Sequence, residues 1–521
     1  MNIKKRAIVA TVIITIIFFI KLIINQLLLA ENGDTYDFFK IAYYLQQANF
    51  NYHSKRHILL PILLTPFPPE NFVFFGRIII NVFYFLSVFV FYEIVKKLLN
   101  NQFTAILATL TFAFNYIIFE NSFYILADSL FLFLNLSYIY IYKKNNHQKP
   151  LYLSIVSALA FYTRPEGAIL VLVTVILYAK NFYKNNLLTN FKLLKNIGFL
   201  KYLLSLAILL LPHFLRNFIY YKNPFHSGYF SDPAGFIFDK ASFLLRISNL
   251  FFGHGGFWLI PVIVLFFNFN KLKHLKLEIL LLFLYLVALF LWGPYIRLYT
   301  IPIGLLIFIT FALLNTAPKI NQQKIFIAFF ITLILAIFYL YIVQIYNYRD
   351  LGFSKLGKAL CLLGSIIIVI LSYFIYYKNK FNKYLLLITT TLIIFLNLGL
   401  FVDKFYITRH KYSTIKQAVQ YYLQVKDNGE NLSYSNESGV ESWYLKDFTK
   451  RYYYGGNTNL STYLKTNNIK YFITTDEMGY KDNFSKLNLN NIEKFTIVKK
   501  YKSPFFPGST KLVKIIDYSE K

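Results

Sequence analysis

Two things are scarce in this chain of 521 residues: charge and cysteine. Charged residues make up 15% of it, against roughly 25% in soluble domains, which excludes a soluble globular enzyme and a disordered chain. The single cysteine, Cys361, cannot form an intrachain disulfide, so a disulfide scaffold is excluded as well. Apolar residues are abundant instead, at 57% of the chain, and the mean hydropathy is +0.47. This composition predicts a multi-pass membrane protein.

Long apolar runs recur along the first 402 residues and predict about thirteen transmembrane helices. The predicted spans are 7–30, 71–95, 103–119, 123–142, 151–163, 166–179, 198–220, 257–270, 277–292, 298–315, 325–344, 357–377 and 384–402. The net charge is +30, and the lysines sit in short clusters between these runs, which favours a role in membrane topology over nucleic-acid binding. With the N-terminus inside, every inner connection is basic, as the positive-inside rule requires. The same rule favours a hairpin of 151–163 and 166–179 over one long kinked helix.

The polar tail after the last span predicts a second domain. The transmembrane domain covers 1–402, with long outer loops at 31–70 and 221–256, and an extracytoplasmic domain covers 403–521. In the tail, 411–426 is predicted to be a helix, and the predicted strands are 432–435, 471–475, 495–501 and 511–516, the last two spaced as a hairpin. The predicted fold class is an all-α polytopic protein of the plasma membrane, N-terminus inside, with a small C-terminal α/β domain on the outer face.

Ionisable side chains lie mostly at the outer ends of the predicted spans, where they are costly to place and therefore informative. They are Asp34, Asp37, Arg56, His57, Arg77, Glu120, Asp128, Arg164, Glu166, His213, Arg216 and Arg297. Either these side chains reach the membrane interface one by one, or they share a polar cavity that opens outward. The alternating signs of charge and the short Asp and Glu side chains favour the cavity. Carboxylates there can act as a base or as metal ligands, and arginines can bind phosphate bidentately. Glu93 lies at the opposite end, beside Lys96 and Lys97, and is assigned a structural role.

Short motifs follow one another along residues 1–310. They are Gly33-Asp34-Thr35-Tyr36-Asp37, Arg56-His57-Ile58-Leu59-Leu60-Pro61, Ala127-Asp128-Ser129-Leu130, Thr163-Arg164-Pro165-Glu166-Gly167, Leu215-Arg216-Asn217-Phe218 and Arg297-Leu298-Tyr299. Together with the predicted topology they resemble the C-type (GT-C) glycosyltransferases, most of all the branch of protein O-mannosyltransferases and lipid A aminoarabinose transferases. Many relatives place an acidic residue directly beside the first-loop Asp, whereas Thr35 follows Asp34 here. Whether Asp37 or Glu31 shares the role of Asp34 stays open, and so does a requirement for a divalent metal; no metal ligands are assigned.

The resemblance implies a GT-C-like fold and an enzyme that transfers a hexose or pentose from a polyprenyl-phosphate donor to an acceptor on the extracytoplasmic face. It implies an inverting displacement with Asp34 as base; the alternative is that Asp34 caps a helix at 35–47. Arg56, Arg164 and Arg297 are candidates for binding phosphate, or else interface anchors. Asp37, His57, Asp128, Glu166 and Arg216 complete the predicted substrate-binding set. Asp128 and Glu166 could bind sugar hydroxyls or pair with arginines, and pairing is favoured for Glu166.

Three other functions compete with sugar transfer from a monophosphate carrier. A polysaccharide polymerase or ligase would use diphosphate-linked glycans, and its outer-loop patterns differ. A lipid or glycan transporter often has repeated halves, and no repeat is obvious in this sequence. A scaffold that only binds partners leaves Asp34, Asp128 and Arg164 without a task. The transferase is therefore the prediction, with a protein, lipid or glycan as the unidentified acceptor.

Overall fold

The computed structural model describes residues 16–28, 31, 33–52, 56–99, 101–144, 149–183, 197–226, 275–291, 299–316, 383–408, 413–427, 430–434, 440–445, 460–475, 492–502 and 509–520. These residues form a mostly helical protein with one small mixed sheet. They divide into two compact units. The larger unit comprises Asn49–Leu63 and Gly76–Lys404, and the smaller one Met1–Ala48, Leu64–Phe75 and Phe405–Lys521.

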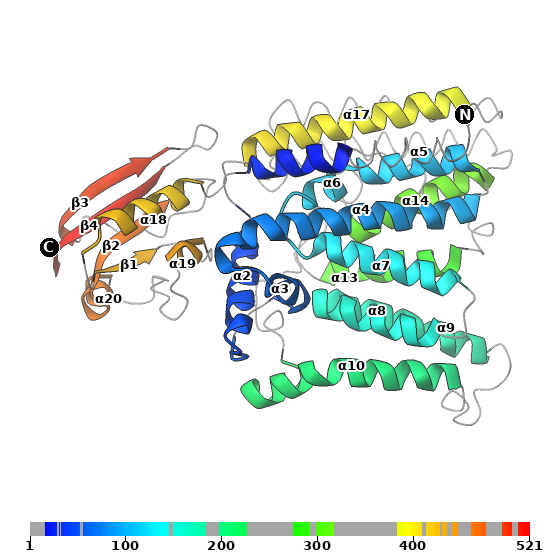
Figure 1. Ribbon diagram of the computed structural model, residues 1–521, viewed down its shortest axis with the longest axis horizontal. Helices are drawn as coiled ribbons and strands as arrows, with labels where there is room; N and C mark the ends of the chain where they lie inside the picture. The colour runs from blue at the N-terminus through cyan, green and yellow to red at the C-terminus, as the bar shows by residue number, and fades with distance from the viewer. Residues whose placement is uncertain are drawn as a thin grey trace. The chain divides into compact units, whose positions relative to one another are not determined.

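Helices, most of them long and lying side by side, make up most of the larger unit (Figure 1). They are α4 (Phe72–Leu99), α5 (Gln102–Ala113), α6 (Tyr116–Asn121), α7 (Asp128–Lys143), α8 (Lys149–Thr163), α9 (Ala168–Tyr183), α10 (Ile197–Tyr221), α13 (Lys276–Leu291), α14 (Thr300–Thr316) and α17 (Lys383–Thr408), and the short α3 (Leu59–Leu64) precedes them. Helix α8 packs against α7 and α10, and α14 packs against α5 and α13. Within the described residues, two helices are long and apolar enough to cross a membrane, Pro69–Leu99 and Ile197–Tyr221, and shorter apolar helices accompany them.

The helix boundaries confirm one prediction and correct another. The hairpin predicted for 151–163 and 166–179 is present as α8 and α9, which pack on each other and are separated by the 3-10 turn η2 (Pro165–Gly167). The single span predicted at 103–119 is wrong, because the chain forms α5 and α6 with a break between them. Asn115 accounts for the break: its side chain accepts hydrogen bonds from the amides of Ile117 and Ile118 at 3.2 and 3.5 Å, and so starts a new helix.

Some of the predicted topology falls outside the part of the chain that the structure describes. This applies to the spans predicted at 257–270, 325–344 and 357–377. The number of spans and the inside position of the N-terminus therefore stay predictions.

Aromatic and amide contacts fasten the helices of the larger unit around α6. Phe91 of α4 stacks on Phe112 of α5, with ring centroids 4.1 Å apart. The Asn397 side chain of α17 accepts a hydrogen bond of 2.8 Å from the Tyr116 amide, which satisfies one of the free N–H groups at the start of α6. Phe401, one turn further along α17, packs edge-on against Phe119 at 4.7 Å. These contacts fix the segment that leads into α7, whose first residue is Asp128.

The smaller unit joins the first-loop helix α2 (Gly33–Gln46) and η1 (Pro69–Asn71) to the C-terminal part of the chain. The C-terminal elements are α18 (Ser413–Val425), β1 (Asn431–Tyr434), α19 (Val440–Leu445), α20 (Leu460–Thr466), β2 (Ile469–Thr475), β3 (Ile492–Tyr501) and β4 (Thr510–Glu520). The sheet order is β1-β2-β4-β3, with β1 parallel to β2 and the other pairs antiparallel. The helix and the four strands predicted from the sequence are confirmed, including the pairing of the last two strands. The division of the chain into domains at residue 402 stays a prediction.

An aromatic cluster connects α2 with α19 inside the smaller unit. The Phe39 ring lies 4.8 Å from the Trp443 ring and 5.8 Å from the Phe72 ring, and Trp443 stacks on Phe72 at 5.8 Å. Beside them, the hydroxyl oxygens of Tyr36 and Tyr444 are 3.3 Å apart. The first-loop helix is therefore held by side chains from the C-terminal part of the chain.

Candidate functional site

Arg164 lies in the turn between α8 and α9, and the local sequence fixes its backbone. The residue is extended (φ −156°, ψ 147°) because the following Pro165 disfavours a helical conformation at the residue before it. Gly167 closes the turn, and its amide donates to the Arg164 carbonyl at 2.9 Å. A Cβ at Gly167 would lie 2.3 Å from the carbonyl carbon of Ala160 in α8, so only glycine fits there. The turn thus places Arg164 and Glu166 side by side.

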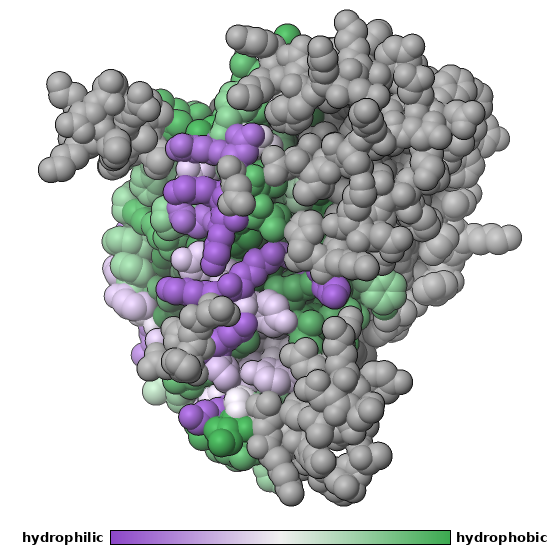
Figure 2. Space-filling model, turned by 90° about the vertical axis from the view of Figure 1, so that its right-hand side faces the viewer, coloured by the Kyte–Doolittle hydropathy of each residue, from purple (hydrophilic) through white to green (hydrophobic). Residues whose placement is uncertain are grey.

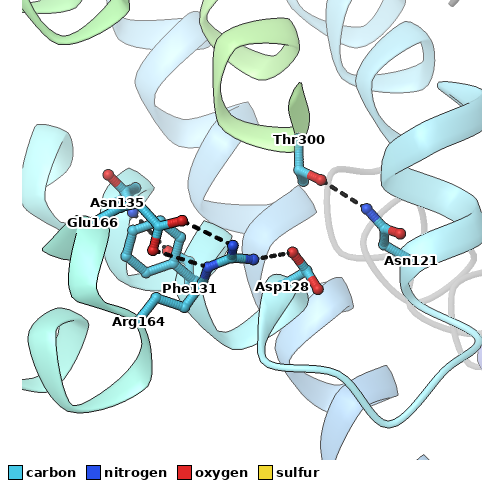
Figure 3. Close-up of polar contacts among 7 residues, drawn as sticks. All are labelled: Asn121, Asp128, Phe131, Asn135, Arg164, Glu166 and Thr300. Carbon is cyan, nitrogen blue, oxygen red and sulfur yellow. Dashed lines mark hydrogen bonds and ion pairs between the residues drawn. The ribbon is translucent and has the colours of Figure 1, made fainter. Parts of the chain in front are cut away.

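The Arg164 guanidinium is held between two carboxylates (Figure 3). Its Nη2 and Nε donate to the Glu166 carboxylate at 2.9 and 3.3 Å, and its Nη1 donates to Asp128 Oδ1 at the start of α7. The Asp128 side chain is 4% exposed, and those of Arg164 and Glu166 are each 14% exposed. The guanidinium carbon lies 5.7 Å from the centre of the Phe131 ring. The pairing favoured for Glu166 is confirmed, and Asp128 pairs with the same arginine.

His57 and His213 bring two further segments to this cluster. Their rings are nearly parallel, with centroids 6.1 Å apart, and each lies edge-on to the Phe161 ring in the last turn of α8. Burial lowers the pKa of His57 to about 4; His213 adds to this effect, and the nearby Glu166 carboxylate opposes it. The His57 ring is therefore neutral near pH 7 and adds no positive charge to the cluster.

Arg216, near the end of α10, is occupied by the chain segment that precedes Arg56. Its Nε donates to the Phe50 carbonyl at 3.1 Å, and its Nη2 donates to the Tyr52 carbonyl at 2.6 Å. The guanidinium carbon lies 3.8 Å from the centre of the Tyr52 ring. The Tyr221 hydroxyl donates to the same Tyr52 carbonyl at 2.7 Å. Arg216 therefore fixes residues 50–52 against α10, a task that the sequence did not predict for it.

Sequence reasoning missed the residues that surround Arg216. Tyr52 and Tyr221 gave no signal because aromatic residues make up 20% of the chain. Asn217 belongs to the motif Leu215-Arg216-Asn217-Phe218, but the sequence predicted no functional role for it. In the structure it is buried, and its side-chain amide lies within hydrogen-bond distance of the Pro224 and His226 carbonyls and of the His213 ring. The sequence signal that could have identified Asn217 is an asparagine in an apolar helix shortly before the Asn223-Pro224 turn.

Asp34 and Asp37 belong to α2 in the smaller unit. Helix α2 begins at Gly33, so Asp34 stands at its N-terminal end, and the capping role stays a prediction beside the catalytic one. Both carboxylates are half-buried, and their spacing of three residues places them on one face of the helix. The positive end of the helix dipole stabilises a negative charge at Asp34.

Of the two remaining predicted site residues, the structure describes one and not the other. Arg56 is half-buried next to His57, whereas Arg297 lies outside the described residues. In the described ranges, the structure contains no group of three or more His, Cys, Asp or Glu side chains arranged to hold a metal ion.

Two polar contacts also bridge the helices around Arg164. The Asn121 amide donates to the Thr300 hydroxyl at 2.7 Å (Figure 3), and the Tyr285 hydroxyl donates to Asn135 at 2.6 Å.

The structure thus gathers residues from four distant segments of the larger unit. They come from the loop before α3, the start of α7, the turn after α8 and the end of α10: Arg56, His57, Asp128, Arg164, Glu166, His213 and Arg216. Their roles in substrate binding stay predictions. In this arrangement, buried ion pairs join Arg164 to Asp128 and Glu166. The His57 ring stacks on that of His213, and backbone carbonyls hold Arg216.

No protein-family model matches the sequence, and no curated protein is similar enough to match it. The solved structures that match in fold include two of ArnT from Cupriavidus metallidurans. The one bound to undecaprenyl phosphate has a TM-score of 0.60 at 8% sequence identity, and the apo structure has a TM-score of 0.58 at 9% identity. Each comparison covers 99% of this chain and 99% of the other. The chain therefore has the fold of ArnT, which confirms the fold that the motif resemblance implied.

Proposed function

We propose that this protein is a membrane glycosyltransferase that moves a hexose or pentose from a polyprenyl-phosphate carrier to an acceptor on the extracytoplasmic face. The observation that carries the proposal is the fold shared with ArnT over the whole of both chains, since one of the ArnT structures is bound to undecaprenyl phosphate. The ordered motifs of residues 1–310 point to the same class. The enzyme would lie in the plasma membrane, with residues 403–521 outside.

In the proposed reaction, a hydroxyl oxygen of the acceptor attacks the anomeric carbon from the side opposite the carrier phosphate. The new carbon–oxygen bond forms as the bond between the anomeric carbon and the phosphate oxygen breaks. The bonding electron pair leaves with the polyprenyl phosphate, and the configuration of the sugar inverts. A carboxylate takes the hydroxyl proton, and cationic side chains stabilise the charge that the phosphate gains.

Asp34 is the proposed base. It matches the first-loop Asp of the family, and its place in the first turn of α2 favours the ionised form that a base needs. Asp37 lies one turn further along the same face and is proposed to contact the substrate.

The phosphate role falls to arginines other than Arg164. Two carboxylates already pair with the single positive charge of Arg164, so an incoming phosphate would compete with both of them. Arg56 and Arg297 therefore become the preferred phosphate ligands. Arg164, Asp128 and Glu166 are proposed to fix the shape of the donor site, His57 to contact the substrate there, and Arg216 to hold residues 50–52 against α10.

The proposal is tested with membranes that contain the full chain and a panel of radiolabelled polyprenyl-phosphate sugars. Loss of label from one carrier in the wild type, and none in Asp34→Asn, would support both the activity and the base. Asp427→Asn removes an exposed carboxylate of the smaller unit and is the matched control, which should keep wild-type turnover.

Other outcomes contradict the proposal at separate points. Near-full transfer by Asp34→Asn would remove Asp34 from the chemistry while keeping the transferase. Consumption of diphosphate-linked glycans alone would identify a polymerase or ligase. If every carrier neither bound nor turned over, the transferase itself would be wrong.

A further inference from the structure

Four lysines converge where α4 and α7 end. Lys96 and Lys97 stand in the last turn of α4, and Lys143 and Lys144 stand at the end of α7. All four line one pocket of about 600 Å³. Figure 2 looks at the molecule from the side on which both helices end, and it shows hydrophilic side chains gathered in a band among apolar ones. This pocket has no part in the proposed sugar transfer.

Among the described residues around the pocket, the charges do not cancel. The Lys143 ammonium lies 2.6 Å from a carboxylate oxygen of Glu278, which is buried in the first turn of α13. Glu93 lies 3.9 Å from Lys96, in line with the structural role predicted for it. Each of the two helix ends adds a partial charge of about −0.5. The four lysine charges, reduced by two carboxylates and two helix ends, sum to a net charge of about +1. The exposed Lys97 and Lys144 carry this remaining positive charge.

The pocket wall is amphipathic. Besides the lysines it is lined by Ile94, Leu98 and Tyr140, which offer apolar surface next to the ammonium groups. A free anion would need the cations alone, whereas a phospholipid presents a phosphate and acyl chains together. Basic pockets between transmembrane helices bind the headgroups of anionic lipids in this way. We propose that the pocket at the ends of α4 and α7 binds the phosphate headgroup of an anionic phospholipid.

Native mass spectrometry of the full chain in a neutral detergent tests this proposal. Dioleoylphosphatidylglycerol is the probe, and dioleoylphosphatidylcholine, with the same chains and no net charge, is the comparison lipid. The wild type should retain the anionic lipid selectively. Lys97→Gln with Lys144→Gln should weaken its binding roughly fivefold for each lysine, hence about 25-fold.

Two paired variants separate the pocket from the general charge of the surface. Lys201→Gln with Lys222→Gln removes two exposed lysines of the larger unit outside the pocket and should leave the affinity unchanged. Lys97→Arg with Lys144→Arg keeps the charge and should keep binding. Unfolding temperatures of all variants show whether each remains folded.

Three outcomes would overturn the proposal. Equal retention of both lipids would mean that the headgroup charge is not recognised. An equal loss in the Lys201 and Lys222 pair would assign binding to the surface as a whole. Binding of inorganic phosphate with the same lysine dependence, together with displacement of the lipid by millimolar phosphate, would make the pocket a site for the free anion.

Discussion

The charges of Arg164, Asp128 and Glu166 stabilise one another, because the three side chains are largely buried and water compensates them little. Removing one partner of a buried ion pair leaves a charge without compensation, and this costs about 3–5 kcal/mol. An exposed pair of the same residues would contribute no more than about 1 kcal/mol. The two cases can be told apart by substitution at Arg164.

We expect Arg164→Gln to lower the free energy of unfolding by about 3–5 kcal/mol, because it leaves Asp128 and Glu166 facing each other. Asp128→Asn in the same chain should recover part of this loss, since it removes one of the two carboxylates. Arg164→Lys should fall between the wild type and Arg164→Gln, because an ammonium keeps the charge without the bidentate geometry. Denaturant unfolding of the purified chain in detergent measures all four proteins. A cost below about 1 kcal/mol for Arg164→Gln would show a solvated pair instead.

Among the structural elements, the turn η2 depends most on its sequence. Gly167→Ala would place a Cβ 2.3 Å from the backbone of Ala160 and Phe161, and backbone atoms cannot move aside as a side chain can. We expect a loss of about 1–3 kcal/mol or more, together with displacement of Glu166 from Arg164. Gly304→Ala in α14 is the matched control: its Cβ would meet only side-chain atoms, the nearest being the edge of the Phe112 ring at 3.1 Å, and helix propensity offsets the cost by roughly 1 kcal/mol. Thermal unfolding of both variants measures the difference, and equal losses would contradict this account of the turn.

Elements that repeat a strong local pattern could be predicted from the sequence. Apolar runs marked α4, α8, α9 and α10 to within a few residues, and alternating residues marked the four strands of the sheet. The break at Asn115 was missed because the apolar run continues through it, and a single side chain that caps α6 changes the average very little. The pattern of apolar residues therefore predicts where a helix or strand lies, but it does not predict where a single side chain breaks a helix.

The site could be predicted as a set of residues but not as a set of contacts. Arg164 and Arg216 were both recognised as costly charges, yet their partners decide what they do. Arg164 meets two carboxylates, one of them from α7, and Arg216 meets backbone carbonyls about 165 residues away in sequence. Carbonyl acceptors leave no mark in a sequence, because every residue carries one.

At the scale of the whole molecule, the smaller unit is assembled from three separate stretches of the chain. Helix α2 and the η1 segment lie about 400 residues before the elements with which they cluster. Trp443 is 4% exposed and packs between Phe39 and Phe72, so the C-terminal part of the chain contributes directly to the stability of the first loop. Such long-range packing could not be predicted from periodicity, which describes each element alone.

Trp443→Ala should therefore loosen α2, although the two lie in distant parts of the sequence. Truncation of a buried tryptophan typically costs about 3–5 kcal/mol, and here the exposed faces would be those of Phe39 and Phe72. We expect the amides of residues 36–42 to exchange hydrogen faster in Trp443→Ala, while those of α8 in the larger unit keep wild-type rates. Trp443→Phe retains a ring in the cluster and should show a much smaller change. Unchanged exchange in α2 would mean that the cluster does not hold the helix. Faster exchange with loss of sugar transfer would link the C-terminal part of the chain to the helix that carries Asp34.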